Sequence, residues 1–193
     1  MILLETLRLI LREFGLDDWP AVHAYAGDPE VVRYLIWGPN TEEETRVFLC
    51  QTLAHQCQAQ RALYSFAVVL KDEGSLIGNV SLHVSAPDHR GGFIGYIFNR
   101  RYWGYGYATE AARRLLAFGF EELGLHRIFA TCDPLNIASS RVLEKIGMRC
   151  EGHLREHKWQ KGRWRDSLMY AILAREWDVL VTNNEGKHTQ GHP

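Results

Sequence analysis

The chain has 193 residues, of which 46% are apolar, and its formal net charge at pH 7 is −1. A chain of this length and apolar content can bury one sizeable core, so we expect a single domain over residues 1–181. The near-zero charge excludes a whole-surface field that would recruit nucleic acid or anionic lipid. We therefore expect no direct nucleic-acid binding and no membrane partner.

The cysteines and the first residues of the chain indicate its compartment. Cysteines stand at 50, 57, 132 and 150 without a C-x-x-C pair, and we expect Cys132 and Cys150 to be core thiols. Glu5 and Arg8 interrupt the apolar start of the chain, which predicts neither a signal peptide nor a membrane span. These features favour a soluble protein of the reducing cytoplasm.

The N-terminal part of the chain predicts one strand and two helical segments. Residues 7–14 (LRLILREF) alternate leucine with arginine and isoleucine, which is the period of a strand with one buried face. Asp17 is expected to cap a helical segment. Thr41 and Glu44 form an S/T-x-x-E capping box, which predicts a longer helix to about residue 60.

The sequence then predicts three strands, followed by alternating helices and strands. Residues 62–71 and 76–86 are rich in Val, Leu, Ile and Phe and flank turn residues, so we expect them to form a hairpin. The other expected elements are a strand at 92–99, a helix to about 123, a strand at 127–132, a helix at 137–146 and strands at 148–159 and 163–173. This order suggests an α+β fold with a mixed sheet. Residues 182–193 have no apolar period and are predicted to be a disordered tail.

A glycine-rich turn between a strand and a helix is the most informative segment. Residues 93–116 read FIGYIFNRRYWGYGYATEAARRLL, so Gly104 and Gly106 directly precede a predicted helix. Free amide groups and the positive dipole end of a helix favour an anion, and glycine lets a phosphate approach the backbone. A pyrophosphate is the ligand that we expect, although a turn chosen only for its backbone geometry is the alternative. A dinucleotide-binding G-x-G-x-x-G motif is excluded, because its third glycine would stand at Thr109.

This turn resembles the cofactor loop of the GNAT acetyltransferases, Q/R-x-x-G-x-G/A. Arg101, Gly104 and Gly106 match its fixed places, and residues 103–111 (WGYGYATEA) resemble the RimJ/RimL-like branch in particular. Residues 136–148 (NIASSRVLEKIGM) are similar to a helix of that branch, and residues 151–177 to its closing hairpin and last helix.

The resemblance implies a GNAT fold, with a mixed central sheet of about seven strands, a V-shaped splay and about four flanking helices. It also implies acetyl-CoA as the cosubstrate and direct attack of an amine on the thioester. Separately from the resemblance, we expect no metal. The implied cofactor contacts are the backbone of Tyr96, Ile97 and Phe98, the amides of Arg101, Tyr102, Trp103, Gly104, Tyr105, Gly106, Tyr107 and Ala108, and the Asn136 amide. Asn136 could equally serve as a helix N-cap.

The catalytic residues depart from the pattern of many GNAT enzymes. Residues 92–99 contain no Asp, Glu or His, and Leu143 stands where a tyrosine acid is usual. The resemblance implies that Ser139 protonates the leaving thiolate, the alternative being a structural hydroxyl in the first helical turn. It also places the branch's proposed carboxylate at Lys158, so a base would have to come from a neighbour.

Three side chains are candidates for that base: Glu156 and His157 in the closing hairpin, and His83 in the strand at 76–86. His153 and His157 stand four apart in a predicted strand, where that spacing does not suit a metal. A weak or absent base favours α-amines, because about a tenth of such amines are neutral at pH 7, against far fewer lysine side chains.

The sequence does not identify the acceptor substrate. A protein N-terminus, such as that of a ribosomal protein, and a small amine, such as an amino acid, polyamine or antibiotic, are both compatible with the resemblance. A CoA sensor without turnover is a rival interpretation, and so is a nucleic-acid-associated protein that uses the basic hairpin at 155–166. We expect a monomer or a homodimer.

Overall fold

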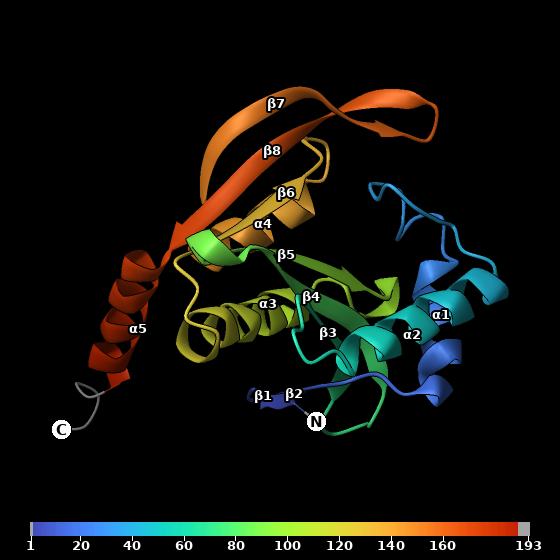
Figure 1. Ribbon diagram of the computed structural model, residues 1–193, viewed down its shortest axis with the longest axis horizontal. Coiled ribbons are helices and arrows are strands. Elements are labelled where there is room, and N and C mark those ends of the chain that lie inside the picture. Colours follow the sequence, from blue (N-terminus) through green and yellow to red (C-terminus); the bar gives the residue numbers. More distant parts are fainter. Residues whose placement is uncertain (1, 189–193) are drawn as a thin grey trace.

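The computed structural model describes residues 2–188, without the side chains of residues 86, 87 and 183–188. Within these residues the chain forms a single sheet of eight strands with five α-helices around it (Figure 1). The strands are β1 (Leu3–Glu5), β2 (Leu9–Arg12), β3 (Leu63–Leu70), β4 (Leu76–Ala86), β5 (Gly91–Phe98), β6 (Arg127–Cys132), β7 (Arg149–Gln160) and β8 (Arg163–Leu173). The α-helices are α1 (Trp19–Ala26), α2 (Glu42–Gln56), α3 (Tyr107–Ala117), α4 (Ile137–Lys145) and α5 (Ala174–His188).

The sheet is mixed, as predicted. Its strand order is β1-β2-β3-β4-β5-β6-β8-β7, and every neighbouring pair is antiparallel except β5 with β6. The α+β fold expected from the sequence is confirmed, with one strand and one helix more than the approximate numbers expected. The additional strand, β1, has three residues, and two of them are exposed, so it carries little periodic signal.

Several predicted elements are confirmed. The Thr41–Glu44 capping box is present, with the Thr41 hydroxyl accepting from the Glu44 amide and the Glu44 carboxylate accepting from the Thr41 amide. The hairpin of β3 and β4 forms around residues 71–75. Gly147 ends the α4 segment with a φ of 92°, a backbone conformation in which glycine is favoured.

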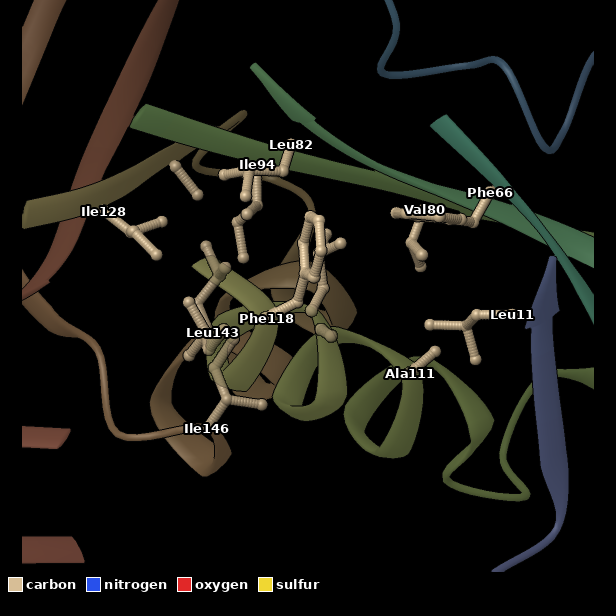
Figure 2. Close-up of a cluster of buried hydrophobic side chains, with 14 of the residues drawn as sticks. Leu11, Phe66, Val80, Leu82, Ile94, Ala111, Phe118, Ile128, Leu143 and Ile146 are labelled. Atoms are coloured by element: carbon tan, nitrogen blue, oxygen red, sulfur yellow. The ribbon is translucent and has the colours of Figure 1, made fainter. Parts of the chain in front are cut away.

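α3 and α4 cover one face of the sheet and α1 and α2 cover the other. On the α3 face, Ala111 of α3 is buried in one cluster with Val80 and Leu82 of β4 and Phe118 after the helix (Figure 2). Alanine at the contact lets a helix approach a sheet closely, because its side chain is small. The second face carries a smaller core that includes Val22, Leu49 and Ala67. The two faces therefore have separate packing, and the sheet lies between them.

Two predictions at single residues are wrong. Cys150 is exposed rather than a core thiol, whereas Cys132 is buried as expected. The carboxylate that organises the start of the first helical segment is Asp18, not Asp17, because Asp18 accepts from the Gly15 amide and pairs with Arg12 at 2.7 Å. Asp17 is exposed.

The C-terminal part of the chain ends in helix α5. Its Trp177 indole donates to Glu121 and stacks on Phe120, which attaches the helix to the α3 side of the core. The sequence predicted a disordered tail from residue 182; α5 continues to His188, and residues 189–193 lie outside the described residues. In the part of the chain that the structure describes, no helix combines the length and apolar character that crossing a bilayer requires.

Candidate active site

The two central strands separate from each other partway along their length. β5 and β6 pair in parallel only where Gly91–Phe93 face Arg127–Phe129. Beyond these three pairs, the backbone of residues 94–98 has its β4 partner on one side and no β6 partner on the other. The V-shaped splay predicted from the sequence is thus confirmed, and it leaves backbone amide and carbonyl groups of β5 available to a ligand.

A cavity of about 880 Å³ occupies this splay. Its walls come from the diverging parts of β5 and β6, the glycine-rich turn, α4, the segment 30–37 and the far part of the β7–β8 hairpin. In Figure 1 that hairpin reaches over the sheet towards the segment between α1 and α2. The cavity therefore contacts elements on both faces of the sheet.

The glycine-rich turn has the geometry of an anion-binding helix start. Gly104 and Gly106 have φ values of 86° and 84°, which favour glycine, and Gly106 is the N-cap residue of α3. The amides of the first helical turn, at 107–109, have no acceptor inside the helix. Of the predicted loop residues, Tyr102, Trp103, Gly104, Gly106, Tyr107 and Ala108 line the cavity, whereas Arg101 and Tyr105 do not.

The N-terminal segment fixes this turn in place. Glu110 of α3 accepts from the Thr6 hydroxyl at 2.6 Å and from the Arg8 amide at 2.9 Å. Burial opposes ionisation of Glu110, but these hydrogen bonds and the Arg8 charge outweigh it and hold the pKa of the carboxyl below its usual range. Arg8 also donates to the Tyr105 carbonyl at 3.1 Å and lies over the Tyr107 ring. Sequence reasoning missed this support, since the partners are about a hundred residues apart.

Two hydroxyl groups meet in the cavity wall. The Ser139 hydroxyl of α4 lies 2.9 Å from the Tyr96 hydroxyl of β5, which also donates to the Ser139 carbonyl at 3.1 Å. Burial raises the pKa of Tyr96, so its hydroxyl stays neutral near pH 7. Asn136 is the N-cap of α4, with its side-chain oxygen accepting from the Ser139 amide at 3.2 Å, which leaves its NH₂ group for a ligand.

The predicted base candidates lie outside the cavity lining. Glu156 and His157 are exposed in the irregular stretch of β7 between Leu154 and Lys158, where the pairing register shifts and Glu156 has a φ of 47°. His83 packs edge-to-face against Phe93 at the far end of β5. The structure thus brings Ser139 to the cavity but not these three side chains.

The carboxylates that line the cavity beside the hairpin are held by other groups. Asp133 pairs with Arg165 at 2.7 Å, and both side chains are largely buried. Asp166 accepts from the Glu156 amide at 2.8 Å and pairs with His153 at 2.7 Å. These hydrogen bonds hold the pKa of Asp166 below its ordinary value.

The cavity also contains polar groups that the sequence did not single out as ligand contacts. Gln160 donates to the Leu35 carbonyl at 2.7 Å, which ties the hairpin to the segment 30–37. Asn79 of β4, which is buried, donates to the Ser65 hydroxyl at 2.8 Å. Arg141 and Lys145 of α4 line the same cavity as Asn136 and Ser139. Each comes from an element that the sequence predicted, but no motif marked these side chains as ligand contacts.

A parallel strand pair that splays beside an anion-binding helix start defines the class of transferases that bind an acyl-CoA in the gap of the sheet. Residues 8–149 match the family model of the acetyltransferase (GNAT) domain. The chain belongs to the GNAT family and is an N-acetyltransferase.

Relatives and solved structures agree with this assignment. The chain is 41% identical over 175 residues to "Uncharacterized N-acetyltransferase YnaD" of Bacillus subtilis, covering 91% of this chain and 99% of that protein. It is 26% identical over 182 residues to the [Ribosomal protein uS5]-alanine N-acetyltransferase of Escherichia coli, covering 90% and 92%. A crystal structure of a GNAT acetyltransferase from Bacillus anthracis has a TM-score of 0.81 at 40% identity, covering 90% and 99%. The resemblance to the RimJ/RimL-like branch is confirmed.

Proposed function

We propose that this N-acetyltransferase transfers the acetyl group of acetyl-CoA to a primary amine in the cytoplasm, and that protein N-terminal α-amines are its favoured acceptors. The observation that carries the proposal is a single cavity that joins the glycine-rich turn, the unpaired edge of β5 and the Ser139 hydroxyl. These are the parts that a pyrophosphate, an amide-bearing arm and a leaving thiolate require.

The residues present fit the cosubstrate. The amides at the start of α3, together with Gly104 and Gly106, suit a pyrophosphate, and Arg141 and Lys145 add positive charge on the same side. The unpaired backbone from Tyr96 to Phe98 suits the amide groups of pantetheine, as in strand addition to an open edge. The NH₂ group of Asn136 is a further donor beside them.

In the proposed reaction, protons are transferred by Ser139, Tyr96 and solvent. When bound, acetyl-CoA supplies a thioester whose carbonyl carbon bonds to the amine nitrogen as the carbon–sulfur bond breaks. Ser139 donates a proton to the departing sulfur, the Tyr96 hydroxyl at 2.9 Å can return one to Ser139, and solvent then reprotonates Tyr96. The proton released by the amine passes to solvent, since the carboxylates that line the cavity beside the hairpin are already hydrogen-bonded. An unpaired amide N–H of β5 can stabilise the oxygen as it becomes negative.

Two observations favour an α-amine acceptor. One is the relative from E. coli whose name describes it as an N-acetyltransferase of an alanine in ribosomal protein uS5. The other is that, among the described residues, the carboxylates that line the cavity beside the hairpin are held by other groups, which matters less for an α-amine with a pKa near 8 than for a lysine side chain. A ribosomal protein N-terminus is accordingly the first macromolecular acceptor to test.

A thiol-release assay tests the proposal directly. Acetyl-CoA is supplied with two matched peptides, one with a free N-terminus and no lysine, the other with an acetylated N-terminus and one internal lysine. Turnover of the first alone near pH 7 is expected. Comparable turnover of both would remove the α-amine preference, and absence of thermal stabilisation by CoA would remove the cosubstrate assignment.

A further inference from the structure

The two faces of the splayed sheet divide the cavity into two regions. Successive side chains of a strand point to opposite faces. In β6, Cys132 contacts Ser140 of α4 at 3.4 Å, so Cys132 points to the α3 and α4 face. Thr131 therefore points to the other face, which α1, α2 and the far part of the β7–β8 hairpin approach. The glycine-rich turn and Ser139 belong to the first face, and Thr131 belongs to the second.

Lys158 lies in the second region. Its ammonium group donates to the Thr131 hydroxyl at 2.9 Å, and its side chain is half-buried in the cavity wall. Burial lowers the pKa of Lys158, because the charged form loses water contacts without gaining an opposite charge. The hydrogen bond with Thr131 holds the ammonium group beside the gap between β5 and β6.

The carboxylates of this region already have other partners. Asp133 pairs with Arg165, Asp166 with His153, and Glu30 lies 3.8 Å from Arg33. Among the residues that the structure describes, no carboxylate lies within ion-pair distance of Lys158. A half-buried cation without a counter-charge is unfavourable, and an anionic group entering beside it would form a charge-assisted hydrogen bond.

We propose that Lys158 selects acceptors that carry a carboxylate close to the reacting amine. This rests on the proposed function, which it deepens by naming the acceptor class: amines with a neighbouring carboxylate, as in peptide N-termini followed by Asp or Glu. The cosubstrate phosphates do not account for Lys158, because the amides, Arg141 and Lys145 that would hold them lie on the α3 and α4 side of the sheet.

Matched peptides test this selection. Peptides that differ only by Glu or Gln at the second residue are compared by kcat/KM and by calorimetric binding to the CoA-loaded protein. The wild type should prefer Glu on the order of tenfold or more, mostly through KM. Lys158→Met should abolish the preference, and Lys158→Glu should invert it towards a lysine at the second residue. Arg163→Met, an exposed change on the same hairpin outside the cavity, should keep it.

The outcomes separate the two proposals. Equal binding of the Glu and Gln peptides, or no binding of either, would overturn the role of Lys158, as would loss of acetyl-CoA affinity in Lys158→Met. Failure of the proposed function would instead appear as selective binding of the Glu peptide without thiol release. Free glutamate and glutamine form a third arm, and a larger preference there would identify a free amino acid as the source of the carboxylate.

Discussion

At the scale of single residues, the hydroxyl pair of Ser139 and Tyr96 is the feature closest to the proposed chemistry. The sequence predicted Ser139 as an acid, but it assigned only the backbone of Tyr96 to the site. The structure adds the Tyr96 side chain, whose hydroxyl lies 2.9 Å from that of Ser139. The position where many GNAT enzymes carry a tyrosine is Leu143, which is buried in the core. A hydroxyl therefore reaches the cavity from β5 as well as from α4.

Ser139→Ala should reduce kcat for thiol release by about tenfold to a hundredfold, while acetyl-CoA affinity changes little, because a positioned general acid acts mainly in the transition state. Ser140→Ala is the matched control: it removes a neighbouring hydroxyl that is buried against Cys132 and does not line the cavity. Steady-state kinetics and a CoA titration of both variants give the comparison. An unchanged kcat in Ser139→Ala would leave Ser139 with a structural role only.

One local motif was enough to predict that Gly104 and Gly106 stand in a turn directly before a helix. Both have positive φ and line the cavity, and their contact with a phosphate stays a prediction. Glu156 and His157 were predicted as candidate bases because they stand next to Lys158, the position that matches the proposed carboxylate of the branch. The irregular stretch in β7, where Glu156 has a positive φ, changes which side chains face the sheet. The sequence contains no pattern from which this irregularity could be predicted. Lys158 alone of the three lines the cavity.

At the scale of elements, the turn before α3 combines backbone strain with ligand access. An added Cβ at Gly104 would meet no atom within 4 Å, so a side chain there would not disturb the core. Its φ of 86° would still strain any L-residue. A substitution at this position therefore has two effects, strain in the turn and obstruction of the proposed phosphate site, and they need to be separated.

Gly74 provides the control for this separation. It lies in the β3–β4 turn, has a φ of 67° and has equally open surroundings, but does not line the cavity. Gly104→Val and Gly74→Val should each lower the free energy of unfolding by about 1–2 kcal/mol. Only Gly104→Val should lose stabilisation by acetyl-CoA, as measured by thermal shift. Retained stabilisation in that variant would contradict the proposed position of the pyrophosphate.

Elements with a strong local signal were predicted well, and features that depend on pairing were not. The capping box of α2 and the β3–β4 hairpin are encoded within a few neighbouring residues, so propensity and pattern suffice. The helix of α2 nevertheless ends at Gln56, earlier than the predicted residue 60. The separation of β5 from β6 was expected from family resemblance alone. The residues of the two strands do not indicate the position at which their pairing ends.

At the scale of the whole molecule, the sheet separates two chemical environments and connects them through one gap. The α3 and α4 face carries the anion-binding turn, the Asn136 amide and the hydroxyl pair. The opposite face carries Lys158, Asn79 and the segment 30–37, held by Gln160. A cosubstrate and an acceptor can thus approach from different sides of the sheet.

The stability of the whole fold depends on pH through Glu110, whose carboxylate joins the N-terminal segment to the turn before α3. Its pKa is below the ordinary value, so the stability that it contributes is fully present above the unfolded-state pKa of about 4 and is lost as the pH falls through the folded-state pKa. Asp18, whose pKa is lowered by Arg12 and the Gly15 amide in spite of burial, acts with the same sign.

Glu110→Gln should therefore lower the Tm at pH 7, and the difference from the wild type should shrink as the pH falls below about 4. Thermal unfolding from pH 7 to pH 3 measures this, with Glu73→Gln in the exposed β3–β4 turn as the control for loss of one negative charge. Because Glu110 holds Arg8 beside Tyr105, Glu110→Gln should also weaken stabilisation by acetyl-CoA at pH 7. A constant Tm difference between the variant and the wild type across this range would mean that the carboxylate contributes by packing and not by its charge.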